Sequence, residues 1–218
     1  MHRVLEPEIM EDRDQSVAYA AADFSTTNQL FVDGLLRDYP DAGDQIVDIG
    51  CGPCDVMIRL ARLRPSLRIT AVDGSAEMIG IAEQAIAAAQ LKSRVTPMKG
   101  YIPGLPLTEH SFDVVLSKDL LHHLPEPTVL WNEAKRLGRK GAVLYVMDLV
   151  RPPTADAARN IVETAAGNEP PILKEDFYNS LCAAFTLEEV RQQVQQCSLK
   201  VSVEPFGSRH MLIKGQLE

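Results

Sequence analysis

Short apolar runs alternate with amphipathic stretches between Gln45 and Leu149. The apolar runs are rich in Val, Ile and Leu, as is typical of strands that are buried on both faces of a sheet. They predict strands at 45–49, 68–73, 94–98, 112–117 and 142–149. The stretches between them predict helices at 53–64, 75–91 and 127–138. Strands and helices that alternate at this spacing form βαβ units with right-handed crossovers, so we expect a parallel sheet with helices on both faces.

The pattern changes on both sides of this region. Residues 1–44 predict two helices that precede the sheet. Residues 151–180 contain RPP and GNEPP, and these prolines exclude one long helix, so we expect a helical insertion packed over one end of the sheet. Thr186 and Glu189 have capping-box spacing and predict a helix that reaches about Cys197. The runs KVSVEP and HMLIKG, joined through FGSR, predict a closing β-hairpin.

We therefore predict an α/β fold. Its centre is a doubly wound, mostly parallel seven-stranded sheet with an antiparallel last strand, preceded by N-terminal helices and carrying a helical insertion after the fifth strand. A chain of 218 residues favours one such domain with appendages over two full domains. We expect an N-terminal helical cap at 1–44 and a Rossmann-like domain at 45–218, with the insertion at about 151–180.

Composition narrows the classes of partner. Hydrophobic residues make up 45% of the chain and charged residues 24%, as in ordinary globular proteins. A net charge of −8 disfavours binding to a phosphate backbone, so we expect a small-molecule partner and no nucleic acid. The acidic start lacks the features of a signal peptide, and no apolar run approaches the length of a membrane span, which predicts a cytoplasmic protein with free thiols.

The stretch VDIGCGPCD, residues 47–55, carries the first chemical signal. Gly50 and Gly52 follow a predicted strand and precede a helix, whose N-terminal N–H groups and positive dipole end suit an anionic ligand. The next strand ends in Asp73 and Gly74. Doubly wound folds place a carboxylate at this position to bind ribose hydroxyls, so the two features together predict a cofactor that contains a nucleoside.

These motifs resemble those of a known family. VDIGCGP, AVDGS and KGYIPGLPLTEHSFDVVLSKDLLHHLPEP occur in the order and at the spacing of the class I S-adenosylmethionine-dependent methyltransferases, particularly the small-molecule group that includes ubiquinone- and menaquinone-biosynthesis enzymes. The resemblance covers about Gln45 to Leu149. It implies in-line transfer of the methyl group of S-adenosylmethionine to a small molecule. Such a transfer can depend on placing the reactants and excluding water, so it requires no distinctive catalytic side chain.

The resemblance also implies a set of cofactor contacts. Asp73 would bind both ribose hydroxyls, and a carboxylate can accept two hydrogen bonds from a vicinal diol. The other implied contacts are Asp48, Gly50 and Gly52 for the methionine part, Gly74, Met78, Gly100, Tyr101 and Ile102 for the adenine, and the backbone of Lys118.

Two positions depart from the family pattern. Cys54 stands where the family often has a third glycine, so the start of the helix must tolerate a side chain. Tyr101 stands where the family often has an Asp that accepts from the adenine amino group. A tyrosine can stack or offer a hydroxyl, but it supplies no charged acceptor, so we expect the adenine contact to depend on Ile102, apolar packing and backbone groups.

Candidate substrate contacts follow the same edge of the sheet. His123, after the fourth strand, is a candidate general base or substrate contact, with packing or capping as the alternative. Asp148 could orient a nucleophile and Arg151 could hold an acidic substrate, or the pair could fix the insertion through ion pairing. The remaining candidates are Tyr19 in an N-terminal helix (alternatively packing beside Phe24), Tyr178 in a lid (alternatively helix packing), and Arg209 and His210 in the hairpin turn. No histidine pair has the spacing of metal ligands, and the adjacent His122 and His123 are expected to diverge on a helix, so we expect no metal.

Three other functions remain open. Cys51 and Cys54 form CGPC, the sequence of thioredoxin active sites, at a helix N-terminus that lowers a thiol pKa, and their oxidation to a bridge would weaken cofactor binding. Gly50, however, stands where thioredoxin-like proteins usually have Trp. A nicotinamide-dependent oxidoreductase also uses a glycine loop and an acid, but Asp55 replaces the last glycine of its fingerprint. The third alternative is a non-catalytic scaffold that binds the cofactor.

Overall fold

The computed structural model describes residues 1–6 and 13–218 and contains one seven-stranded sheet between helices. The strand order is β3-β2-β1-β4-β5-β7-β6. The strands are β1 (Gln45–Ile49), β2 (Arg68–Asp73), β3 (Val95–Lys99), β4 (Phe112–Lys118), β5 (Gly138–Leu149), β6 (Val201–Phe206) and β7 (His210–Gln216). β1 to β5 pair in parallel, and β7 is antiparallel to both β5 and β6. This topology confirms the predicted fold class.

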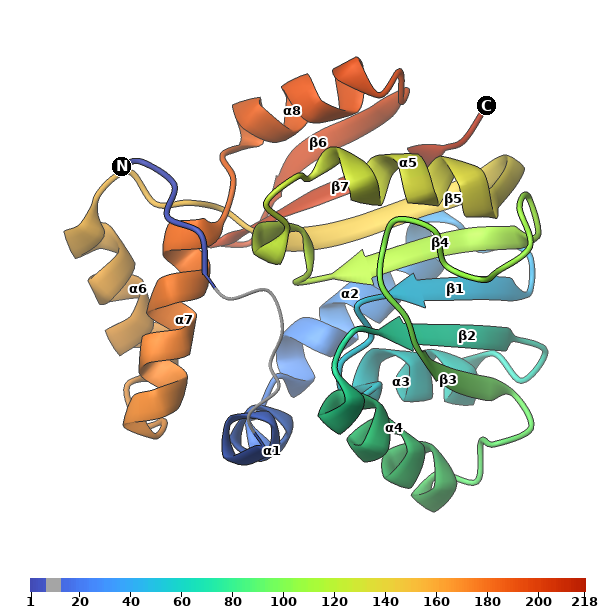
Figure 1. The fold of residues 1–218 in the computed structure, drawn as a ribbon, viewed down its shortest axis with the longest axis horizontal. Helices are drawn as coiled ribbons and strands as arrows, with labels where there is room; N and C mark the ends of the chain where they lie inside the picture. The colour runs from blue at the N-terminus through green and yellow to red at the C-terminus, as the bar shows by residue number, and fades with distance from the viewer. Residues whose placement is uncertain (7–12) are drawn as a thin grey trace.

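Helices cover both faces of the sheet (Figure 1). Those before and within the sheet region are α1 (Arg13–Ala21), α2 (Ser25–Asp38), α3 (Asp55–Leu63), α4 (Ala76–Ala88), the 3₁₀ helix η1 (Leu121–His123) and α5 (Thr128–Leu137). Those after β5 are α6 (Ala155–Ala166), α7 (Pro171–Ala183) and α8 (Leu187–Gln196). Residues 7–12 of the predicted N-terminal cap at 1–44 lie outside the described residues. Among the described residues, no helix is both long enough and apolar enough to cross a membrane.

The alternation of side chains along each strand divides the core into two layers. Ile46 and Tyr145 point to the layer that contains residues of α2, α3 and α4, such as Phe31. Val47 and the fully buried Trp131 belong to the layer under α5 and α8. The Trp131 Nε1–H group donates to Gln193 Oε1 at 3.1 Å, which satisfies a buried polar atom and joins α5 to α8.

Helix starts follow the capping signals in the sequence. The Ser75 side chain accepts a hydrogen bond from the Met78 N–H group and begins α4. Thr186 and Glu189 form the predicted capping box at the start of α8. Pro171 occupies the first turn of α7, where its missing N–H group costs no helical hydrogen bond.

Several boundaries of helices and strands differ from the sequence prediction by one to four residues, and the largest shift is at the start of β5. β5 begins at Gly138, directly after α5, rather than at residue 142. The additional residues include Arg139 and Lys140, which are exposed and lack the apolar pattern from which the strand was predicted. The register with β4 shifts between Phe112 and Val114 at this point. The insertion also extends further than predicted, because α7 ends at Ala183.

The carboxyl ends of the parallel strands face a group of helices. In Figure 1, α6 and α7 lie beyond the tips of the strand arrows, on the same side as α1 and the N-terminus. α1 packs against α4 and α7, and α7 packs against η1. The edge of the sheet at which doubly wound folds bind ligands is therefore enclosed by the N-terminal helices and the insertion.

The packing of α2 on β5 allows a test of the fold. A methyl group at Gly34 would overlap the Tyr145 hydroxyl, whereas it would lie 3.6 Å from Tyr145 Cζ, an ordinary contact. We expect Gly34→Ala to lower the free energy of unfolding by about 1–3 kcal/mol through overpacking. The Tyr145 hydroxyl is buried and has no hydrogen-bond partner, so adding Tyr145→Phe should recover most of this loss. Urea denaturation of the two single variants and the double variant measures the coupling.

Gly80→Ala in α4 is the matched control. A methyl group there meets no atom within 4 Å, so the helix propensity of alanine should raise stability by about 0.5–1 kcal/mol. An equal effect of the two glycine substitutions, or no recovery in the double variant, would contradict the packing described for α2.

Candidate functional site

Asp73 fixes the turn that follows β1. Its Oδ2 atom accepts from the Gly52 N–H group and its Oδ1 atom accepts from the Ser75 N–H group, each at 2.8 Å. Burial raises the pKa of Asp73, while these N–H groups favour the ionised form. Each carboxylate oxygen keeps a further lone pair, so the side chain can still accept from two hydroxyls.

The turn itself is left-handed at three positions. Gly50, Gly52 and Cys54 have φ values of 82°, 51° and 69°. A methyl group at Gly50 would lie 2.9 Å from Leu120 Cβ, whereas one at Gly52 would meet no atom within 4 Å. The space beside Gly52 is therefore open to a ligand. At Gly50, the Leu120 side chain leaves no room for a side chain. Cys54 caps α3 in a conformation that costs a side chain about 1–2 kcal/mol, and its thiol is fully buried.

Tyr101 lies beside the residues predicted to contact adenine. A methyl group at Gly74 would be 3.0 Å from Tyr101 Cε1, so the ring packs against this glycine. The Tyr101 side chain is half exposed, and Lys99 Nζ lies 5.7 Å from the ring centroid. Met78 is buried beneath this region, and Ile102 packs against the core. A methyl group at Gly100 would lie 2.6 Å from Leu105 Cδ2, so the Leu105 side chain packs closely against the backbone of Gly100.

Acidic side chains concentrate at the ends of β1, β2 and β4. Burial and the charge of Asp73 raise the pKa of Asp48 to about 7, and Lys118 opposes this shift. Burial favours the neutral form of Asp119, but the charges of Lys118 and His210 outweigh it and lower the pKa of Asp119 to about 2. Lys118 Nζ contacts Asp119 Oδ2, whereas the buried Asp119 Oδ1 accepts no hydrogen bond. This part of the edge therefore suits a cation.

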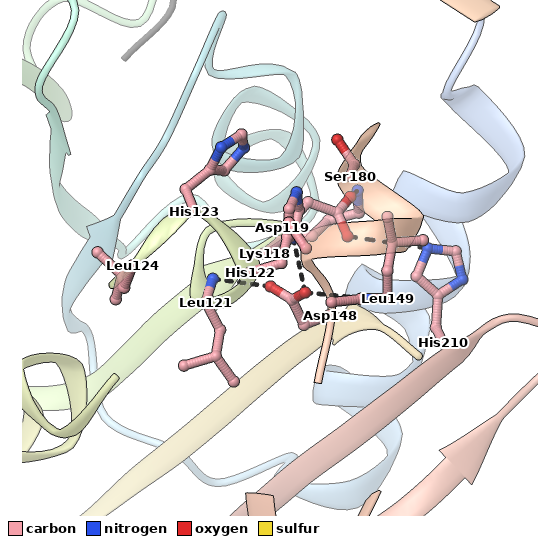
Figure 2. A network of polar contacts seen from close by, with 12 residues as sticks. Lys118, Asp119, Leu121, His122, His123, Leu124, Asp148, Leu149, Ser180 and His210 are labelled. Atoms are coloured by element: carbon pink, nitrogen blue, oxygen red, sulfur yellow. Dashed lines mark hydrogen bonds and ion pairs between the residues drawn. The ribbon is translucent and has the colours of Figure 1, made fainter. Parts of the chain in front are cut away.

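Asp148 organises a second group of polar side chains (Figure 2). Its carboxylate accepts from the Leu121 and Leu149 N–H groups, both at 2.8 Å, and lies 2.7 Å from His122 Nδ1. Burial opposes the charged form of His122, but Asp148 and Glu6 raise its pKa. On the other side of the ring, His122 Nε2 lies 3.5 Å from Glu6 Oε1. Burial raises the pKa of Glu6.

His123 belongs to the same group. Its Nδ1 atom lies 3.2 Å from Glu6 Oε1, and its ring centroid lies 4.2 Å from that of His122. The expectation that the two histidines diverge was therefore wrong: on the short 3₁₀ turn η1, their rings lie side by side. The sequence pattern indicates no functional role for Glu6, His122 or Asp119. For Glu6 no signal was available, because only the folded chain brings it to the end of β4.

Of the other substrate candidates, some lie at this edge of the sheet and others make contacts that join neighbouring elements. Arg151 donates to Ala184 O at 3.0 Å and to Glu189 Oε1 at 2.6 Å, which is the ion-pair alternative that fixes the insertion. The Arg151 guanidinium thus joins the end of β5 to the end of α7 and to α8. His210 Nε2 lies 3.8 Å from Asp119 Oδ1, at the edge, and burial lowers the pKa of His210. The Arg209 guanidinium carbon lies 5.7 Å from the centre of the Phe177 ring and joins the hairpin turn to α7.

Tyr19 and Tyr178 both make packing contacts. The Tyr19 and Phe24 rings are 4.9 Å apart, as the packing alternative expected. Burial raises the pKa of Tyr19, and the charges of Asp119, Asp73 and Asp148 contribute, so its hydroxyl also faces the acidic edge. Tyr178 packs with α6, where Arg159 lies 5.6 Å from the centre of its ring. Tyr178 therefore has the helix-packing contact, while Tyr19 has both the packing contact and a position toward the site.

The thiols of the CGPC stretch are poor nucleophiles. Cys51 and Cys54 are both buried. A hydrogen bond with Cys54 and burial raise the pKa of Cys51, which is opposite to the shift that a reactive CxxC cysteine needs. The structure therefore disfavours thiol redox chemistry at this turn.

Comparisons with known proteins agree with this geometry. The family model for a methyltransferase domain matches residues 40–197. Demethylmenaquinone methyltransferase of Porphyromonas gingivalis is 31% identical over 144 residues, which are 62% of this chain and 59% of that protein. 27-O-demethylrifamycin SV methyltransferase of Amycolatopsis mediterranei is 29% identical over 160 residues, which are 71% of this chain and 58% of that protein. The chain thus spans less than two thirds of the length of these relatives.

Solved structures share the whole fold. The crystal structure of a putative S-adenosyl-L-methionine-dependent methyltransferase from Methanococcus maripaludis superposes with a TM-score of 0.76 at 16% identity. The superposition covers 99% of this chain and 98% of the other. The similarity therefore includes the N-terminal helices, the insertion and the closing hairpin as well as the central sheet.

The buried thiols give a prediction for chemical reactivity. In the native protein at pH 8, we expect Cys51 and Cys54 to react with iodoacetamide at least about tenfold more slowly than in urea, because both thiols are buried and the raised pKa of Cys51 makes its thiolate scarce. Peptide mass spectrometry after timed quenching measures both rates. Equal rates in the native and unfolded protein would show that the turn opens readily, and would restore the thiol hypothesis.

Proposed function

The chain belongs to the methyltransferase domain family, and we propose that it transfers the methyl group of S-adenosylmethionine to a small-molecule acceptor. The observation that carries the proposal is the position of Asp73: a buried carboxylate that holds the glycine turn through one N–H group and retains acceptor capacity for a diol. The two relatives described above act on demethylmenaquinone and on a demethylated rifamycin, by their names, and both acceptors are small molecules.

The residues present fit the cofactor. Asp73 would hold the ribose, and the open side of Gly52 and the N-terminus of α3 would lie along the methionine part. The Tyr101 ring beside Gly74 offers a flat surface for adenine, in place of a charged acceptor. S-adenosylmethionine supplies a methyl group on a positively charged sulfur, and the carboxylates at this edge complement that charge.

Asp119 is suited to the cationic part of the cofactor or to the acceptor. It is ionised at neutral pH, buried, and has one oxygen that accepts no hydrogen bond. Its φ of 56° is unusual for a residue other than glycine, and such strain is commonly retained at functional sites. Lys118 contacts the other oxygen and holds the carboxylate in place.

The acceptor would enter between the N-terminal helices and the insertion. Tyr19, His123 and His210 come from α1, η1 and β7, and the first two of these elements pack against α7. Residues 1–44 would act as the cap that excludes water, and water exclusion strengthens the electrostatic interactions on which an in-line transfer depends. The acceptor atom does not follow from these contacts.

The Asp73 assignment gives a prediction for cofactor binding. Asp73→Asn keeps an amide oxygen for the turn but removes the charge and one acceptor, so we expect affinity for S-adenosylmethionine and S-adenosylhomocysteine to fall about 10- to 100-fold. Isothermal titration calorimetry measures both affinities. Asparagine is preferable to alanine here, because alanine would also release the Gly52 and Ser75 N–H groups.

Asp41→Asn, exposed in the turn before β1 at the opposite edge of the sheet, is the control and should leave both affinities unchanged. Unchanged affinity in Asp73→Asn would place the ribose elsewhere. Binding of NADH without binding of S-adenosylmethionine would overturn the proposal in favour of an oxidoreductase.

A metabolite extract incubated with the protein and S-adenosylmethionine should yield a product heavier by one methyl group. Cofactor binding without any such product would support the scaffold alternative.

A further inference from the structure

Glu6, His122 and His123 form a compact group of possible metal ligands. Each offers one ligand atom, and the three atoms all lie within 4.8 Å of one another. Glu6 Oε1 lies 3.5 Å from His122 Nε2 and 3.2 Å from His123 Nδ1. Ligands bound at about 2.1 Å around a tetrahedral ion are about 3.4 Å apart. The two distances from Glu6 Oε1 therefore match two edges of a coordination tetrahedron.

The charges of the group favour a cation at its centre. Two imidazole nitrogens lie within 3.5 Å of one carboxylate oxygen, and that oxygen is buried and accepts no hydrogen bond. A neutral imidazole nitrogen without a proton would face this oxygen as a second acceptor, which is repulsive. Either protons or a metal ion must therefore lie among the three atoms.

His122 has the surroundings of a metal-binding histidine. Its Nδ1 atom is engaged by the Asp148 carboxylate at 2.7 Å, and Nε2 is the atom that faces Glu6. A carboxylate on the far nitrogen fixes the tautomer and the ring orientation of a ligating histidine and increases its basicity. Asp148 is itself held by two backbone N–H groups, so the ring orientation is set before any ion binds.

Arg3, three residues before Glu6, holds the N-terminal segment against η1 and the end of α7. Arg3 donates to Ala183 O at 2.6 Å, to His122 O at 2.8 Å and to Leu124 O at 2.9 Å. Its guanidinium carbon also lies 3.8 Å from the centre of the Phe185 ring. One side chain thus fixes both the segment that carries Glu6 and the backbone of the histidine turn.

Glu6 is oriented as well as anchored. Ser180 Oγ, on α7, donates to Glu6 Oε2 at 3.3 Å, and this leaves Oε1 to face the histidines. The Glu6 carboxylate is largely buried, with 9% of its side chain exposed. A largely buried carboxylate that is fixed from two sides is a built element of a site, not a solvated surface charge.

We propose that Glu6, His122 and His123 bind one divalent ion of the first transition row, and that Zn²⁺ fits the site best. Two imidazole nitrogens and one carboxylate oxygen suit Zn²⁺ and its neighbours rather than Mg²⁺, which prefers oxygen ligands. Three protein ligands leave a coordination position for a further oxygen or nitrogen. If the proposed methyltransferase function holds, this position faces the acceptor side of the edge and would hold an oxygen or nitrogen of the acceptor.

Isothermal titration calorimetry with Zn²⁺ tests the site without any methyl-transfer reaction. We expect one Zn²⁺ per chain at micromolar affinity or better, and at least about tenfold weaker binding in each of Glu6→Gln and His123→Asn. His123 is a quarter exposed, so its replacement should not affect folding, and circular dichroism checks both variants. Co²⁺ should give the visible absorption of a low-coordinate complex, and Mg²⁺ should compete for the site only weakly.

Two controls distinguish this site from other possible ligands. His110 lies away from the group, with Nδ1 3.1 Å from Gly138 O, and His110→Asn should bind Zn²⁺ like the unmodified chain. Cys51→Ser with Cys54→Ser should also retain binding, since the two neighbouring thiols of the CGPC stretch are an alternative pair of zinc ligands. Loss of binding in the cysteine variant, retention in the Glu6→Gln and His123→Asn double variant, or no stoichiometric binding at all would overturn the proposal. Metal binding without methyl transfer would count only against the proposed function.

Discussion

The parallel pairing of β1 to β5 determines where every proposed contact lies, because it brings the carboxyl ends of five strands to one edge. This edge contains more buried negative charge than an apolar core can hold without compensation. Asp73 and Asp148 are compensated by backbone N–H groups, and Asp119 by Lys118. Asp48, with a pKa of about 7, is partly protonated at neutral pH. The four carboxylates are therefore kept at the site in different ways.

Local signals determined what could be predicted from the sequence. Strand and helix periodicity and the capping residues before α4 and α8 act over a few residues, and the fold class predicted from them was confirmed. The acid at the end of β2 is also a local signal, and its role toward a ribose stays a prediction. The contacts of Arg151 depend on Glu189 in a different element, so the sequence left two alternatives open. Glu6 is far from both histidines in the chain, and its position depends on Arg3 reaching carbonyls of α7 and of the turn after η1.

The CGPC stretch has the sequence of a thiol redox site, but its backbone forms a left-handed turn at the start of α3 and its thiols are buried. Cys54 occupies a left-handed position at the start of α3, where glycine would be least strained, and its sulfur fills a fully buried space. The packing of that sulfur offsets part of the cost of the backbone conformation. Burial and the mutual hydrogen bond raise the pKa of Cys51 and suppress its nucleophilicity. The two sulfurs are therefore best explained as packing atoms of the turn between β1 and α3.

The carboxyl edge of the sheet has two groups of acidic side chains, one at β1 and β2 and one at β4 and β5, and each group requires positive charge for a different reason. On the β1 and β2 side, Asp48 and Asp73 surround open space beside Gly52, and a cationic ligand can supply the charge when it binds. On the β4 and β5 side, Glu6 and Asp148 enclose the two histidines, and the charge must come from protons or from a metal ion within the group. Lys118, between the two groups, is the cation that the chain itself provides, and it pairs with Asp119. An acceptor that enters beside α7 would thus meet a negatively charged cofactor site on one side and a cation-dependent histidine group on the other.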